Sequence, residues 1–288
     1  MNSKEKSYSK QILIHKIIRH TICIICCIVS LGPFYIMIIN ATRSSVAIQQ
    51  GLTLIPSTWF STNLTNLFDK SVSVGTPIWK AALNSAMITI PATVLTVYFS
   101  SMTAYGIHAY QFKMRNFAWS FILGIMMIPT QVSIIGFYKM LISFKLNDSY
   151  LPLILPAIAA PSTVFFMRQY MKASLPLEIV EAARIDGSGE LRTFNTIVTP
   201  LMKPAIATQA IFAFIASWNN LFTPSIVLSS ASKYTLPMFI QMLRSEQFRQ
   251  DYGIIYMGLF LVVLPLLVVY FLLSKYIIAG VALGGVKE

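Results

Sequence analysis

Charged residues are scarce in this chain. Asp, Glu, Lys and Arg make up only 11% of its 288 residues, whereas 56% are hydrophobic. A soluble globular domain carries about 25% charged residues, so this composition excludes a soluble domain and indicates a membrane protein. The net charge of +12 does not indicate a nucleic-acid partner, because the cations lie in segments beside apolar runs, where they act as orientation signals.

Groups that could carry catalysis or hold a metal are also scarce. Cys23, Cys26 and Cys27 are the only cysteines, and they lie together in one apolar run. They provide no disulfide framework, and without a further Cys or His at ligand spacing we interpret them as small apolar fillers. The sequence contains no G-x-x-x-x-G-K-S/T phosphate-binding loop. We therefore expect a protein that is not an enzyme and that itself holds no metal or cofactor.

Six apolar runs interrupt the chain, and each is near the ~20 residues that cross ~30 Å of hydrocarbon as a helix. They are residues 17–40, 83–105, 117–138, 150–167, 204–228 and 254–276. The first run is longer than the apolar core of a signal peptide and has no clear cleavage site, so it predicts an uncleaved helix. The expected fold class is all-α, a polytopic membrane protein with six transmembrane helices.

The Lys and Arg residues predict the orientation of these helices. Placing the amino terminus inside assigns most of the 22 Lys and Arg residues to the cytoplasm, as the positive-inside rule favours. The expected organisation is a cytoplasmic tail over residues 1–16, a first transmembrane helix over 17–40, an external loop over 41–82, a transmembrane core over 83–277 with a cytoplasmic loop at 172–203, and a cytoplasmic tail over 278–288.

Residues 172–203 form a polar island between the fourth and fifth apolar runs. Pro176 suits the start of a short helix, and Gly187 is placed to end it. A second short helix is expected to end before Pro200, which biases Thr199 away from the helical conformation. Two short helices joined at a glycine would form a knob that fits a partner's groove. From composition alone, a solvated loop between helices remains the alternative.

The island resembles the cytoplasmic coupling loop of ABC importer permeases, in which E-A-A, a glycine and, nine residues later, I-x-L-P recur. Every fixed position matches except Thr199, where that family usually has leucine. The resemblance implies that this loop contacts ATPase subunits. The residues expected to do so are Glu181, Ala182, Ala183, Asp186, Gly187, Ile197 and Pro200.

Two further segments resemble carbohydrate permeases of the maltose-transporter type. Residues 217–222 and 233–237 read S-W-N-N-L-F and K-Y-T-L-P, and the chain ends in a similar short tail, of which Gly285, Val286 and Lys287 are expected to make cytoplasmic contacts. The resemblance covers residues 50–288 and implies a type I ABC importer permease (MetI-like) fold. It also implies a bacterial cell-membrane location with both termini cytoplasmic, and a role as the smaller permease of a sugar importer. The implied partners are a second related permease, two ATPase subunits that bind ATP and Mg, and an external sugar-binding protein.

Polar residues within the apolar runs are few. Gln131 lies in the third run, and Gln209, Trp218, Asn219 and Asn220 lie in the fifth. An aromatic ring beside amides suits a sugar, whose C–H face packs on the ring while its hydroxyls exchange hydrogen bonds. The expected substrate path is therefore Gln131, Trp218, Asn219 and Asn220. The alternative is that these side chains join neighbouring helices.

Two other functions compete with this interpretation. One is a stand-alone secondary carrier or facilitator, which usually keeps ionisable residues at membrane depth. No Asp or Glu lies within the six runs, which argues against it. The other is a scaffold or insertase without a path for small molecules, which does not predict the fixed spacing between Gly187 and Ile197.

Overall fold

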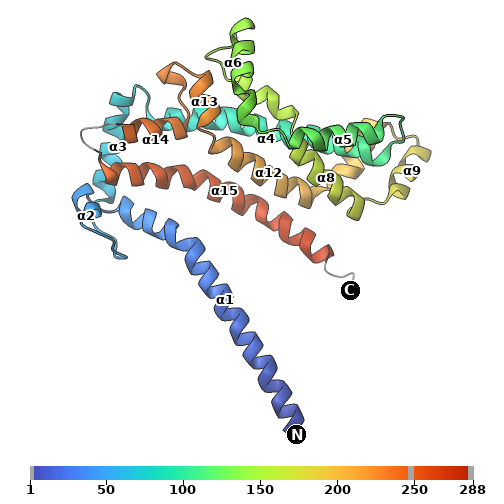
Figure 1. Cartoon of the computed structure of the whole chain (residues 1–288), viewed down its shortest axis with the longest axis horizontal. Helices are drawn as coiled ribbons and strands as arrows, with labels where there is room; N and C mark the ends of the chain where they lie inside the picture. The colour runs from blue at the N-terminus through green and yellow to red at the C-terminus, as the bar shows by residue number, and fades with distance from the viewer. Residues whose placement is uncertain (1–2, 246–249, 285–288) are drawn as a thin grey trace. The chain divides into compact units, whose positions relative to one another are not determined.

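The computed structural model describes residues 3–245 and 250–284, with side chains for 13–71, 73–129, 132–245 and 250–276. These residues form helices joined by loops, and none of them lies in a strand (Figure 1). The predicted all-α fold class is confirmed. The chain divides into two compact units, residues 1–69 with 246–261 and residues 70–245 with 262–288.

The first unit contains α1 (Ser3–Ala41), α2 (Ser45–Gln49), most of α3 (Phe60–Val74) and the start of α15 (Tyr252–Gly284). Arg43 is buried, and its guanidinium donates to the Asn40 side chain at 3.1 Å and to the carbonyl of Gly51 at 3.0 Å. The buried Asn63 amide donates to two backbone carbonyls at 2.8 and 2.9 Å. These bonds satisfy the backbone that leaves α1. Ordered helices therefore occupy much of the segment for which the sequence predicted an external loop.

The second unit holds the remaining helices. They are α4 (Ile78–Ala109), α5 (Arg115–Met126), η1 (Thr130–Ser133), α6 (Ile134–Ser143), α7 (Leu151–Ile154), η2 (Leu155–Ile158), α8 (Pro161–Ser174), α9 (Leu177–Ile185), α10 (Glu190–Thr193), η3 (Phe194–Val198), α11 (Thr199–Leu201), α12 (Lys203–Trp218), α13 (Phe222–Val227), η4 (Ala231–Lys233) and α14 (Leu236–Ser245).

Helix α4 is the central helix of the second unit, and α8 and α12 pack along it (Figure 1). Buried polar side chains of α4 hold the two short 3-10 helices η2 and η4 and the loop that follows η4. The Asn84 amide donates to the carbonyls of Ser232 at 3.0 Å and Tyr234 at 2.9 Å, and the Thr96 hydroxyl donates to the carbonyl of Ala157 at 3.0 Å. Irregular backbone at membrane depth is tolerated only where protein groups or a water-filled cavity form hydrogen bonds with its N–H and C=O groups. The polar side chains of α4 supply such hydrogen bonds, so helices can be interrupted beside α4.

Four described helical stretches are long and apolar enough to cross a membrane. They are Leu13–Ala41, Ile78–Ala109, Leu151–Ser174 and Tyr252–Tyr276. A fifth is obtained if the pair Glu190–Leu201 and Lys203–Trp218, bent by 84°, is one broken span. The structure is therefore a polytopic helical membrane protein, as the sequence predicted, with four or five candidate spans among the described residues where the sequence predicted six.

Residues 117–138, the third predicted span, do not form one continuous helix. Helix α5 ends at Met126, and α6 begins at Ile134 after a turn of 3-10 helix. Pro129 between them is extended, with φ −63° and ψ 123°. Proline has no N–H and biases the residue before it away from helix, so the helix stops there. The fifth predicted run, 204–228, is also divided, because α12 ends at Trp218 and α13 begins at Phe222.

Asp148 joins the loop before α7 to the loop before α14. One carboxylate oxygen accepts from the backbone N–H groups of Ser229 at 3.0 Å and Ser230 at 3.1 Å. The other accepts from the Ser230 hydroxyl at 2.6 Å and the Lys233 ammonium at 3.0 Å. The Ser230 hydroxyl, followed by these other donors, holds the pKa of Asp148 well below its usual range. The carboxylate therefore stays ionised and fixes the Lys233–Pro237 segment that the sequence singled out.

Candidate functional site

Residues 176–201, here called the coupling loop, fold as two short helical segments joined at Gly187. The Ser188 N–H donates to the carbonyl of Ala183 at 2.9 Å, and the Gly187 N–H donates to the carbonyl of Arg184 at 3.0 Å. Gly187 has φ +75°. These two bonds and the left-handed residue form the Schellman motif that ends many helices. The predicted helix stop at Gly187 is thus present in the structure.

The second segment of the loop continues past Thr199, contrary to our expectation. Thr199 is helical, with φ −58° and ψ −44°. The residues before it form a π turn in which the N–H of Thr199 donates to the carbonyl of Phe194. Pro200, which cannot donate a backbone hydrogen bond, follows directly after this π turn within the same helical stretch, Glu190–Leu201. The helix therefore continues through Pro200 and does not end before it.

The two faces of the coupling loop differ in exposure. Val180 and Ala183 are 1% and 5% exposed, and Val180 packs with Phe194 and Val198 in a core that includes Ala104 and Tyr105 of α4. Ala183 therefore points inward, because it shares the inner face of α9 with Val180 three residues earlier. Its predicted contact with an ATPase subunit stays a prediction.

The outer face of the loop is open to the surroundings and partly apolar. Exposed residues among those predicted to contact ATPase subunits are Glu181, Ala182, Asp186, Gly187 and Pro200, with Ile197 half-buried. Two large apolar side chains outside the sequence motif lie beside them. Ile185 is 87% exposed and Leu191 is 66% exposed. An apolar patch rimmed by polar residues is typical of a protein interaction site.

A cluster of polar side chains, here called the clasp, ties the coupling loop to the end of α4. Glu190 accepts hydrogen bonds from the hydroxyls of Tyr110 and, at 3.4 Å, Tyr105, and forms an ion pair with Arg184 at 2.9 Å. The Arg184 guanidinium lies 5.0 Å from the centre of the Tyr110 ring. Burial, followed by the hydrogen bond to Glu190, raises the pKa of Tyr110. No sequence spacing connects residues 105–110 with 190, so the clasp could not be found from the motif.

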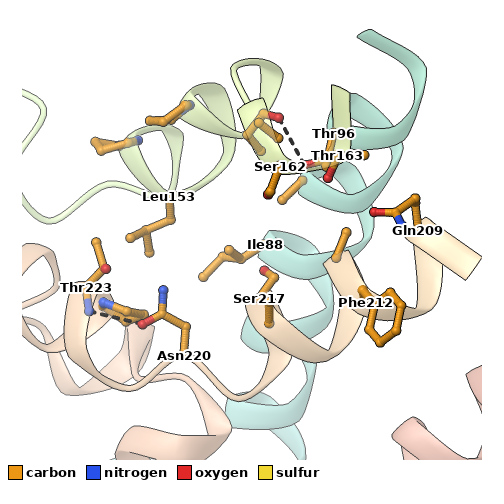
Figure 2. A pocket seen from close by; sticks show the side chains of 18 of the residues that line it. Ile88, Thr96, Leu153, Ser162, Thr163, Gln209, Phe212, Ser217, Asn220 and Thr223 are labelled. Atoms are coloured by element: carbon orange, nitrogen blue, oxygen red, sulfur yellow. Dashed lines mark hydrogen bonds between the residues drawn. The ribbon is translucent and has the colours of Figure 1, made fainter. Parts of the chain in front are cut away.

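A cavity of about 520 Å³ lies between α4, α6, α7, η2, α8, α12 and α13 (Figure 2). Such a volume is within the usual range for small-molecule sites. None of the described residues that line it is charged. Its polar lining consists of Thr96, Ser162, Thr163, Gln209, Ser217, Asn220 and Thr223.

The structure brings one of the four residues of the predicted substrate path to this cavity. Asn220 lines it, and its side-chain oxygen accepts from the backbone N–H of Thr223 at 3.2 Å (Figure 2). Asn219 is exposed and does not line the cavity. The side chain of Gln131 lies outside the described side chains, and Gly285, Val286 and Lys287 lie outside the described residues.

Trp218 is a packing residue in this structure and does not form a wall of the cavity. It is 3% exposed, its ring stacks on Phe214 with centroids 5.5 Å apart, and its Nε1 donates to the carbonyl of Val262 at 3.1 Å. With both ring face and N–H engaged, the side chain has no surface left for a sugar in this arrangement. The alternative of a residue that joins helices describes Trp218 better.

Span-length apolar helices, an uncharged cavity beside broken helices and an exposed helical loop define a membrane permease. Residues 97–282 match the family described as binding-protein-dependent transport system inner membrane component. The chain belongs to this family of ABC importer permease subunits, which are transport components and not enzymes.

Individual relatives match over almost their whole length. The arabinooligosaccharides transport system permease protein AraQ of Bacillus subtilis is 35% identical over 97% of this chain and 99% of its own. The lactose transport system permease protein LacG of Rhizobium radiobacter is 30% identical over 94% and 96%. The sn-glycerol-3-phosphate transport system permease protein UgpE of Escherichia coli K12 is 29% identical over 92% and 95%.

A solved structure shares the fold. A chain in the crystal structure of a bacterial ABC transporter involved in the import of the acidic polysaccharide alginate superposes with a TM-score of 0.76. The superposition covers 91% of this chain and 96% of that chain, at 21% sequence identity. The type I ABC importer permease fold expected from the sequence is thereby confirmed.

Proposed function

We propose that this permease translocates a sugar or oligosaccharide that an external binding protein delivers, and that ATP hydrolysis by partner subunits drives the transport. The observation that carries the proposal is the continuity of α4. Its Thr96 and Ile88 line the cavity, and its Tyr105 belongs to the clasp on the coupling loop. The relatives named for arabinooligosaccharides and lactose support a saccharide as the cargo.

The proposed assembly contains a second related permease, two cytoplasmic ATPase subunits that bind ATP and Mg, and the external binding protein. Its location would be the bacterial cell membrane, with both termini and the coupling loop in the cytoplasm. The distribution of Lys and Arg supports this orientation. The exposed apolar side chains Ile185 and Leu191 would enter a groove of an ATPase subunit, while Glu181 and Asp186 offer it negative charge.

The mechanism follows from the connections of α4. Closure of the ATPase pair on ATP would displace the coupling loop, because the exposed face of the loop is docked there. The clasp and the core around Phe194 would pass this displacement to α4 as a rigid helix. Since α4 also forms a wall of the cavity, its movement would open the cavity to one side of the membrane and close it to the other.

A cysteine scan at two exposed positions tests the docking and the orientation together. In a variant whose Cys23, Cys26 and Cys27 are serine, Ile185→Cys should resist an impermeant thiol reagent in intact cells. It should react in inverted vesicles stripped of ATPase, and it should be protected when purified ATPase is added back. The control Ile55→Cys, at a residue 73% exposed, should label from outside the cell. Labelling of Ile185→Cys from outside, or no protection by ATPase, would overturn the docking proposal.

A further inference from the structure

We propose that the first turn of α8 and Gln209 form a subsite for a hydroxyl group of an uncharged saccharide. The inference rests on the proposed function, since it concerns the cavity through which the cargo passes. It goes further by assigning the subsite to named groups and by choosing between uncharged and acidic cargo. The names of the relatives leave that choice open, because arabinooligosaccharides and lactose are uncharged and glycerol 3-phosphate is an anion.

Gln209 is the first part of the argument. Its side chain lines the cavity, the residue is 8% exposed, and its amide has no hydrogen-bond partner among the described residues. Figure 2 shows the amide end directed toward Thr163 across the corner of the cavity. The amide opens on the cavity, so a polar group that enters the cavity can make the hydrogen bonds that the described residues leave unmade.

The start of α8 supplies matching donors at the same corner. Helix α8 has 14 residues and begins at Pro161 without a side-chain cap. Its first bond to the preceding chain is from the Val164 N–H to the carbonyl of Ala160, at 3.0 Å. Among the described residues, the N–H groups of Ser162 and Thr163 have no acceptor. The Thr163 hydroxyl likewise has no partner in the described part of the chain, although the residue is only 7% exposed.

These groups suit a hydroxyl better than an anion. A sugar hydroxyl can accept a hydrogen bond from an N–H at the start of α8 and donate one to the Gln209 amide oxygen. Both protein groups then have a hydrogen-bond partner. The helix terminus offers only about half a positive charge, and the described lining holds no Lys, Arg or His. An anion would lose its hydration without a full counter-charge, which is costly. Apolar faces of Phe166 and Phe212 in the same lining suit the C–H surface of a sugar ring.

The test uses the complete importer in proteoliposomes, with radiolabelled arabinotriose and its monodeoxy analogues as probes. The wild type should take up arabinotriose about tenfold faster than one of these analogues. A decrease of this size is expected when a buried hydrogen bond between the sugar and the permease is removed. Gln209→Leu and Thr163→Val should slow arabinotriose uptake and reduce that preference to below about threefold. The matched controls are Gln241→Leu, at an exposed residue of α14, and Thr208→Val, whose hydroxyl bonds within α12 to the carbonyl of Pro204. Both controls should keep the wild-type preference.

Three results would contradict the subsite. An unchanged preference in Gln209→Leu and Thr163→Val would remove these residues from the site. A loss of assembled complex, with equal slowing for arabinotriose and every analogue, would make them packing residues. Faster uptake of a radiolabelled diuronate than of arabinotriose by the wild type would overturn the uncharged class but leave sugar import standing. Absence of ATP-driven uptake of any saccharide would instead remove the proposed function itself.

Discussion

Gly187→Val should abolish ATP-driven uptake while the protein still inserts into the membrane. Gly187 has φ +75°, a region that β-branched residues resist, at a strain of about 1–3 kcal/mol. A Cβ at this position would have no neighbour within 4 Å, so the effect would arise from the backbone and not from a clash. Relief of the strain would undo the Schellman motif and turn α9 away, so that the exposed face of the coupling loop no longer fits its partner.

Gly189→Val is the matched control. It lies two residues away, has φ −66° and ψ 152°, and its Cβ would also meet nothing within 4 Å. Valine is comfortable in this extended conformation, so uptake should remain near that of the wild type. The measurement is co-purification of the ATPase with each variant, together with uptake in vesicles. Full ATPase retention and wild-type uptake by Gly187→Val would show that the shape of this turn has no part in coupling.

Glu190→Ala should uncouple the importer, with uptake reduced tenfold or more although the ATPase still binds and hydrolyses ATP. The substitution removes the acceptor for both tyrosine hydroxyls and the partner of Arg184, while the exposed docking face is unchanged. The ion pair itself is half-exposed and contributes only about 0–1 kcal/mol. The loss would thus affect the transmission of motion to α4 more than the stability of the fold.

A double substitution distinguishes the clasp from a general weakening of the loop. Tyr110→Phe alone should reduce uptake less than Glu190→Ala, because Tyr105 and Arg184 still contact Glu190. The double variant Tyr110→Phe/Glu190→Ala should have the same uptake rate as Glu190→Ala alone, since substitutions of residues that act through one group have non-additive effects. Uptake and ATP hydrolysis are measured on the same vesicles. Additive losses, or equal loss of uptake and ATPase binding, would contradict a coupling role for the clasp.

The local elements of the coupling loop were predictable from the sequence because glycine and charge have strong positional preferences. Gly187 could be recognised as a helix end because few other residues adopt its backbone conformation. The behaviour of Pro200 could not, because the π turn before it depends on how Phe194 and Val198 are buried against α4. The inward orientation of Ala183 likewise follows from tertiary packing, which two adjacent alanines do not reveal.

The cavity was less predictable, because a polar residue in an apolar run can face either a neighbouring helix or a path. The sequence assigned the same role to Trp218, Asn219 and Asn220, and their outcomes differ because the chain breaks at the end of α12 and turns each side chain to a different side. The start of α8 carries no charged residue and no aromatic motif, so the sequence did not identify Ser162 and Thr163 as residues of the cavity. Gln209 was a clue besides Asn220, because it is the only amide side chain in the mostly apolar helix α12.

The most direct measurement is the accumulation of radiolabelled arabinotriose in proteoliposomes that contain this permease, a related second permease, the ATPase pair and the binding protein. We expect accumulation only when ATP is supplied on the side of the coupling loop, and none when the ATPase or the binding protein is omitted. Accumulation of the sugar by this chain alone, without ATP or driven by an ion gradient, would contradict an ATP-coupled permease and favour a stand-alone carrier.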